Sequence, residues 1–336
     1  MKSLTLFFIF TFIVSFGQQS DFKNISFKKA DSIAHSYKGE SLDNLPLLTQ
    51  KLSVNLKTNV EKFRAIYTWV CTNIENDYSS YLKTRKKRKK LYKNREALLQ
   101  WNSSFTPKVF KNLQEQKKTA CTGYAYLIRE LTVLAGIECK IINGFGRTAA
   151  LNLQKGSLPN HSWNAIKLNG KWYLSDATWS AGKVMIEDNY PKFIPEYFDG
   201  YFLANPALFI KNHYPLDLEW TLLDNTPTFS QFINGPILYK EAFTYSVIPV
   251  FPKKMHLVTQ KNTPIKFTLS KSSAFTSEEI ALVLVKGDFT KTVTPNITIN
   301  ENICQLQYIF NRTGSYDVHI KIEESIIATY TVKITK

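Results

Sequence analysis

Three side chains well separated in the sequence could together perform chemistry on sulfur. They are the thiol of Cys121, the imidazole of His161 and the carboxylate of Asp176. A thiolate attacks an amide carbonyl far better than a thiol does, and a nearby imidazole can take the thiol proton and return it to the leaving amine. A carboxylate fixes the tautomer of that imidazole and stabilises its protonated form. The three residues therefore predict a Cys-His-Asp triad built on an activated thiol.

The segment around Cys121 predicts a helix over residues 119–136. Apolar residues from Tyr124 to Leu134 recur at helical intervals, and Gly136 follows as a stop signal. Cys121 then lies in the first helical turn, where unpaired backbone N–H groups and the helix dipole favour negative charge on sulfur.

Residues 161–168 and 172–177 predict two strands joined by the turn Asn169-Gly170, a strong hairpin signal. A two-residue turn brings residues 164 and 175 close together across the hairpin. His161 and Asp176 then fall near the same end of the pair, within reach of a hydrogen bond if the register is correct.

The motifs that carry these residues resemble the transglutaminase-like superfamily of papain-related cysteine enzymes. They read Cys-x-Gly-Tyr-Ala at 121–125, His-Ser-Trp-Asn at 161–164 and Gly-Lys-Trp-Tyr-Leu-Ser-Asp-Ala-Thr-Trp at 170–179. Residues 201–220 further resemble the kyphoscoliosis peptidase-like branch. The resemblance implies that Cys121 is the nucleophile, His161 the base and Asp176 the orienting carboxylate. Alanine at position 177 replaces the proline that related sequences tend to have there.

Four further residues are candidates for the cleft. The backbone N–H of Cys121 is a natural oxyanion donor, and Trp101 or Gln116 could supply a second; the alternatives are that Trp101 packs and Gln116 is solvated. Trp163 and Trp179 either wall the cleft or belong to the core.

The chain divides into four predicted parts: a signal peptide (1–17), an N-terminal helical extension (18–57), a catalytic domain (58–224) and a C-terminal domain (225–336). Short runs rich in Val, Ile, Thr and Tyr at steady spacing predict an antiparallel, Ig-like β-sandwich for the last part. The fold class is therefore α+β, a transglutaminase-like core in which the cysteine helix packs on an antiparallel sheet, followed by the sandwich.

The first 17 residues are typical of a secretory signal, because Lys2 precedes an apolar run that ends at small residues. This predicts an exported protein, periplasmic, surface-held or released, without a stable membrane span once the signal is removed; an uncleaved anchor is the alternative.

The formal charge is +16, and the run Lys83–Arg95 supplies much of it. We expect this run to form a solvated loop within a long connection, residues 77–118, that serves as a lid or cleft wall. Its alternatives are contact with an anionic envelope component or with an acidic protein. No aromatic residues are interleaved tightly enough to suggest base stacking, so nucleic acid is not an expected partner.

The four cysteines do not predict a disulfide framework, because a thiolate at Cys121 leaves three others, Cys71, Cys139 and Cys304. The ligand spacing of zinc sites is absent from the sequence, and the predicted chemistry needs no metal or organic cofactor. The favoured function is an exported cysteine peptidase or amide hydrolase acting on a peptide or protein through a thioester. The alternatives are a transamidase and a non-catalytic binding or scaffold protein of the envelope.

Overall fold

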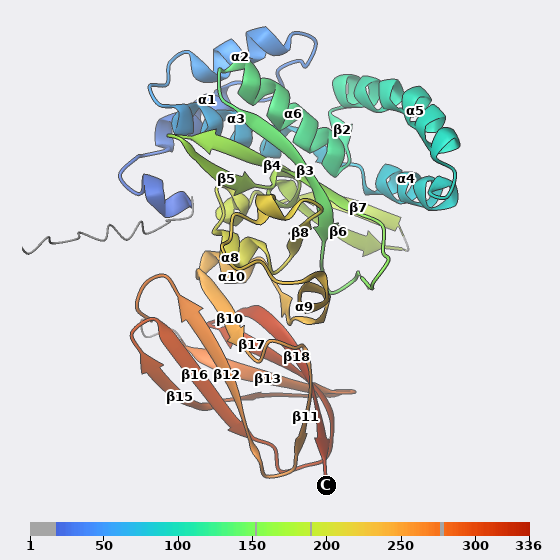
Figure 1. Cartoon of the computed structure of the whole chain (residues 1–336). Coiled ribbons are helices and arrows are strands. Elements are labelled where there is room, and N and C mark those ends of the chain that lie inside the picture. The colour runs from blue at the N-terminus through green and yellow to red at the C-terminus, as the bar shows by residue number, and fades with distance from the viewer. Residues whose placement is uncertain (1–17, 152, 189, 276–278) are drawn as a thin grey trace, which may run out of the picture.

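The computed structural model describes residues 18–151, 153–188, 190–275 and 279–336. The predicted signal peptide, residues 1–17, lies outside the described residues. A layer of helices covers an antiparallel sheet in the first two thirds of the chain, and a β-sandwich follows (Figure 1). Within the described ranges, no helix has both the length and the apolar character needed to cross a bilayer.

The N-terminal layer is centred on α3 (Asn59–Asn73). Thr58 and Glu61 form a capping box that starts this helix, because each side chain accepts a hydrogen bond from the backbone of the other. Residues on every side of α3 are buried, since other helices pack around it. These are α1 (Lys28–Ser36), α2 (Leu45–Ser53), α6 (Cys121–Leu134) and α7 (Ala177–Ala181), while η1 (Gln19–Phe22) precedes them in the chain.

A buried arginine ties the N-terminal extension to this layer. The Nε of Arg64 lies 2.6 Å from the carboxylate of Asp31 in α1, and its Nη1 pairs with Asp199 in η2 (Asp199–Tyr201). A buried guanidinium needs partners of this kind. Residues 18–57 therefore pack as part of the core on one face of the sheet. The other face is covered by residues 201–209, by α10 (Glu241–Thr244) and by the C-terminal strands.

The basic run was predicted to be a loop, and that prediction is wrong: it forms most of α4 (Tyr78–Leu91) and leads into α5 (Arg95–Gln116). Asp77 caps the first helix and Asn94 the second. Lys and Arg are good helix formers. The three basic residues in the last turn of α4 also stabilise it, because they interact favourably with the negative C-terminal end of the helix dipole. Pro107 lies within α5 without ending it.

Two short parallel strands, β1 (Glu75–Asn76) and β2 (Lys118–Thr119), close the long connection formed by α4 and α5. They hold the end of α3 beside the start of α6. Gly123 in the first turn of α6 is tightly enclosed, because a Cβ there would lie 1.9 Å from the hydroxyl of Thr119. The chain therefore leaves α5 through a strand whose position is fixed by β1, immediately before Cys121.

The sheet that faces α6 has the order β5–β4–β3–β8, with all neighbours antiparallel. The predicted hairpin is confirmed, because Asn169 and Gly170 both have positive φ and Asn164 pairs with Ser175. The strands are β3 (Cys139–Gly146), β4 (His161–Leu168), β5 (Lys171–Ser175) and β8 (His213–Pro215).

Short elements connect this sheet to the C-terminal domain. They include a two-stranded hairpin that the sequence did not predict. In chain order they are α7 (Ala177–Ala181), β6 (Gly182–Glu187), β7 (Tyr190–Pro195), η2, α8 (Pro206–Phe209), η3 (Leu218–Thr221), α9 (Phe229–Asn234), β9 (Ile237–Leu238) and α10 (Glu241–Thr244).

The C-terminal strands form two sheets that enclose one apolar core, so the predicted β-sandwich is confirmed. Burial alternates along the strands, as in β17, where every second residue from Tyr316 to Ile322 is buried. The pair β11–β18 is parallel, unlike the antiparallel pairing expected throughout. One sheet contains β10 (Val247–Phe251), β12 (Pro264–Lys271), β15 (Asn296–Asn300) and β16 (Ile303–Ile309), and the other contains β11 (His256–Gln260), β13 (Ile280–Lys286), β14 (Phe289–Val293), β17 (Gly314–Ile322) and β18 (Ser325–Thr335).

Candidate active site

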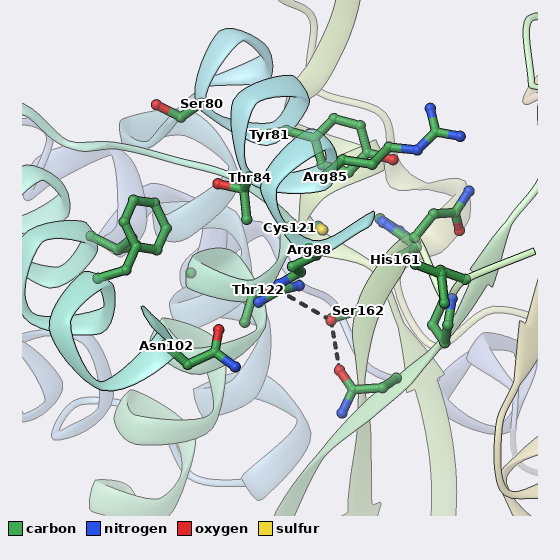
Figure 2. A pocket seen from close by; sticks show the side chains of 18 of the residues that line it. Ser80, Tyr81, Thr84, Arg85, Arg88, Asn102, Cys121, Thr122, His161 and Ser162 are labelled. Carbon is green, nitrogen blue, oxygen red and sulfur yellow. Dashed lines mark hydrogen bonds between the residues drawn. The ribbon is translucent and has the colours of Figure 1, made fainter. Parts of the chain in front are cut away.

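Cys121 is the first residue of α6, as its sequence context predicted. No side chain caps this helix end, so the amides of the first turn remain available to a negatively charged atom. The residue is 8% exposed and lines a cavity shared with His161 (Figure 2). The backbone N–H of Ser162 also helps to lower the pKa of this thiol.

His161 begins β4, and Asp176 follows the last residue of β5. The predicted imidazole–carboxylate contact is present, since Nε2 of His161 lies 2.6 Å from Oδ2 of Asp176. The other carboxylate oxygen accepts hydrogen bonds from the backbone N–H groups of Thr178 and Trp179 and so caps α7. The cap fixes the orientation of the carboxylate, and the occupied Nε2 leaves Nδ1 of His161 for the thiol.

The charges of this group reinforce one another. Burial alone would disfavour the imidazolium, but the Asp176 carboxylate and Cys121 raise the pKa of His161 to about 10. Burial also opposes the thiolate, yet the hydrogen bond and the positive charge of His161 lower the pKa of Cys121 below the ordinary thiol value. Despite its burial, the pKa of Asp176 is lowered by both histidines, His161 first. At neutral pH the arrangement favours a thiolate beside an imidazolium.

A second histidine, which the sequence did not single out for chemistry, completes this cluster. Nε2 of His213, on β8, lies 2.9 Å from the same Asp176 oxygen that contacts His161. Its ring stacks on Phe209 with centroids 3.9 Å apart, and burial is the main cause that lowers its pKa to about 4. His213 therefore stays neutral at pH 7 and is a second imidazole partner of the carboxylate oxygen that contacts His161.

Replacing His213 with phenylalanine is expected to slow alkylation of Cys121 by about tenfold, since a hydrogen bond to a buried carboxylate contributes about 1.5 kcal/mol or more. The ring still packs on Phe209, but Asp176 loses one of its two imidazole partners. The rate of iodoacetamide labelling as a function of pH measures the effect. His213→Gln, which retains an N–H donor, should recover part of the rate; equal losses in both variants would contradict a role for the hydrogen bond.

The structure does not bring Trp101 or Gln116 to the cavity. Trp101 stacks on Phe105, and Gln116 is exposed at the end of α5. The face of α5 that does line the cavity follows the helical period, and position 101 falls outside that face. The α5 residues that line it are Leu98, Asn102, Phe105, Thr106, Lys108, Val109, Phe110 and Asn112.

Trp163 and Trp179 enclose the histidines and do not line the cavity. The indole of Trp163 is buried at 1% exposure, 5.1 Å from the His213 ring, and that of Trp179 lies 5.2 Å from His161. The two indoles exclude water from the His161–Asp176 pair. The attraction between the imidazolium and the carboxylate is stronger without water around it.

The cavity beside Cys121 has a volume of about 1190 Å³. Its walls come from α4, α5, the start of α6, β3, β4 and residues 154–160. The long connection therefore does form a cleft wall, as predicted, although it is helical. A cavity of this size exceeds the usual range for small-molecule sites and has room for a peptide segment.

Three ligand atoms that could bind a metal ion lie within 4.8 Å of one another, on His161, Asp176 and His213. However, both imidazoles contact the carboxylate directly at hydrogen-bond distance, at 2.6 and 2.9 Å. An ion between them would have to separate these groups. No disulfide joins the four cysteines, all of which are buried.

Comparisons with known proteins agree with this geometry. Residues 47–177 match the model of the transglutaminase-like superfamily. Human kyphoscoliosis peptidase is 30% identical over 231 residues, which cover 68% of this chain and 31% of that protein. Hillarin of Drosophila melanogaster is 27% identical over 235 residues, covering 66% of this chain and 26% of its own length. The chain thus spans less than a third of these relatives.

Among solved structures, the filamin domain of Lin-41 aligns with 30% of this chain and 97% of its own, at 18% identity and a TM-score of 0.22, which is too low to support an argument. The superfamily match ends at Ala177, directly after Asp176, and so contains the whole Cys121, His161 and Asp176 cluster. The chain therefore carries a transglutaminase-like domain and belongs with the kyphoscoliosis peptidase-like branch of that superfamily.

Proposed function

We propose that this protein is a cysteine hydrolase that cleaves amide bonds in a peptide or protein substrate through a thioester. One observation carries the proposal: the buried Cys121 begins a helix and lines the same cavity as His161, whose imidazole is held 2.6 Å from the Asp176 carboxylate. A thiolate in such a setting is a nucleophile, whereas a buried structural cysteine is inert.

The proposed reaction has two steps, and His161 transfers a proton in each. The Cys121 thiolate attacks the carbonyl carbon while His161 holds the proton at Nδ1, and the tetrahedral intermediate collapses as that proton passes to the leaving amine. The acyl group is then a thioester on Cys121. Water, deprotonated by His161, attacks the thioester and releases the carboxylic acid and the thiol. Asp176 keeps its charge throughout and stabilises the imidazolium.

The oxyanion requires donors, and Tyr81 is a better candidate than Trp101 or Gln116. Tyr81 projects from α4 into the cavity above Cys121 (Figure 2). Burial raises the pKa of its hydroxyl to about 12, and the negative charge of Cys121 adds to this. The hydroxyl therefore keeps its proton next to the sulfur, where it can donate to the developing oxyanion together with the backbone N–H of Cys121.

Tyr81→Phe is expected to lower kcat for amide cleavage by about a hundredfold, the usual result of removing one oxyanion donor. Alkylation of Cys121 by iodoacetamide passes through no oxyanion, so its rate should stay within about twofold. Tyr78→Phe is the matched control, because Tyr78 stacks on Tyr81 but does not line the cavity. Equal losses of kcat and alkylation rate in the Tyr81 variant would assign Tyr81 a packing role only.

Hydrolysis and transamidation differ in the molecule that accepts the acyl group from the thioester. We propose that this acceptor is water. Incubating the protein with a peptide library and a labelled primary amine, followed by mass spectrometry, separates the two. Shortened peptides with free carboxyl ends would support hydrolysis. Peptides that carry the amine would show that the thioester is resolved as in a transamidase.

We further propose that the protein acts outside the cytoplasm. The support is the pattern of the first 17 residues, a positive start followed by an apolar run. Mass spectrometry of the exported protein should find an N-terminus near Gln18; a full-length protein retained in the cytoplasm would overturn this proposal.

A further inference from the structure

The basic helix α4 has two faces of different character. One face lines the cavity and carries Arg85, Arg88 and Lys89 together with Tyr81 and Tyr92. The spacing of these residues, three or four apart, places them on one side of the helix. The remaining basic residues, Lys83, Lys86, Lys87 and Lys90, do not line the cavity. Figure 2 shows Arg88 beside Cys121 and Thr122, and Arg85 extending past the ring of Tyr81 along the rim of the same cavity.

The cavity as a whole has a strong excess of positive charge. Its one acidic lining residue among the described parts of the chain is Asp77, whose carboxylate is engaged in capping α4. Lys118 is paired with Glu75, at 2.8 Å. The other lysines and arginines that line it have no ion-pair partner within the described residues, and they are Arg85, Arg88, Lys89, Lys108 and Lys155. Like charges gathered around a concave site attract an anionic ligand.

Aromatic rings line the same cavity as these charges. Tyr92, Phe105, Phe110 and Tyr126 line the same cavity, with Phe110 and Tyr126 in contact at a centroid distance of 4.4 Å. Such walls bind apolar side chains and the aliphatic parts of longer ones. The wall of the cavity therefore offers both positive charge and apolar surface.

We propose that this cavity selects an acidic segment of a peptide or protein substrate, with Arg85, Arg88 and Lys89 binding its carboxylates and positioning the adjacent amide at Cys121. The inference rests on the proposed function and names its substrate class. A membrane surface is less well suited, because the three side chains face a concavity, and a flat anionic surface would meet the outward lysines of α4 first.

Two alkylating reagents that differ only in charge test this without knowledge of the natural substrate. Iodoacetate is an anion and iodoacetamide is neutral, and both report the reactivity of Cys121. The ratio of their rates measures the attraction of the cavity for a carboxylate. The combined variant Arg85→Gln, Arg88→Gln, Lys89→Gln should lower that ratio about tenfold at low ionic strength, and about 0.5 M salt should lower it in the wild type as well.

The matched control is Lys83→Gln, Lys86→Gln, Lys90→Gln, which removes the same charge from the same helix outside the cavity. It should keep the wild-type ratio. If both triple variants lower the ratio equally, the effect is one of net charge and the inference is wrong. If Cys121 reacts rapidly with both reagents and neither variant changes the ratio, the inference is wrong while the thiol chemistry stands. Slow reaction with both reagents in the wild type would defeat the proposed function itself.

A binding measurement identifies the anion. Fluorescence anisotropy on Cys121→Ser protein should show that a glutamate-rich peptide binds at least about tenfold more tightly than its glutamine counterpart, and that only the cavity variant loses this preference. If vesicles containing phosphatidylglycerol displace the peptide, and the control variant loses binding instead, then the basic helix binds lipid through its outer face and the inference falls.

Discussion

Cys121→Ser is expected to lower amide-cleaving activity by about 10⁶-fold, the loss seen when the nucleophile of a triad is removed. A serine hydroxyl does not ionise beside His161 as the thiol does, so the thiolate–imidazolium pair is lost although the side chain changes little in size. Turnover of a peptide library, followed by mass spectrometry, measures the loss. Thermal unfolding should remain within a few degrees of the wild type, because no packing contact is removed.

Cys139→Ala is the matched control for this prediction. Cys139 is also buried, in β3, but burial raises its pKa to about 12, so it is an inert thiol. Its replacement should leave turnover within about twofold of the wild type. Activity that survives Cys121→Ser, or that is lost only with Cys139, would place the chemistry elsewhere in the molecule.

Asp176→Asn is expected to reduce activity by about 10⁴-fold, as in other triads where an amide replaces the orienting carboxylate. One side-chain oxygen can still cap α7, but the amide nitrogen now faces the two imidazoles. His161 loses the charge that raises its pKa, so it no longer maintains the thiolate. The pH dependence of turnover should show this as loss of activity at neutral pH with partial recovery in alkali.

The same variant has a stability signature. The pKa of Asp176 is lowered in the folded protein, so its charge stabilises the fold above the unfolded carboxyl pKa of about 4, and that stabilisation is lost as the pH falls through the lower folded value. Urea unfolding midpoints of the wild type and Asp176→Asn should therefore differ at neutral pH and converge in acid. Midpoints that differ equally at all pH values would contradict this electrostatic account.

Local signals in the sequence were sufficient to predict the main features of the site. The start of α6 follows from apolar periodicity, and the relation of His161 to Asp176 follows from one two-residue turn whose register the structure confirms. Such features depend on residues close together in the chain. They could therefore be predicted without knowing the rest of the fold.

Other features depend on contacts that no local pattern encodes. His213 lies on a strand of three residues and meets Asp176 across 37 positions of sequence. The basic run lacks an apolar stripe, so hydrophobic periodicity does not predict α4. The helix begins at the Asp77 cap, and the high helix propensity of Lys and Arg stabilises its interior. Trp101 was misplaced because the face that α5 turns to the cavity is set by its packing against α4 and α6, which no local pattern encodes.

The most direct test of a thiolate held by His161 is the pH dependence of Cys121 labelling. Iodoacetamide at about pH 6, where an ordinary thiol is protonated, should label Cys121 and leave the buried Cys71, Cys139 and Cys304 unmodified. His161→Ala should move the labelling of Cys121 to the alkaline range of a free thiol. If Cys121 reacts no faster than the other three in the wild type, or reacts equally fast without His161, the thiolate–imidazolium pair does not exist.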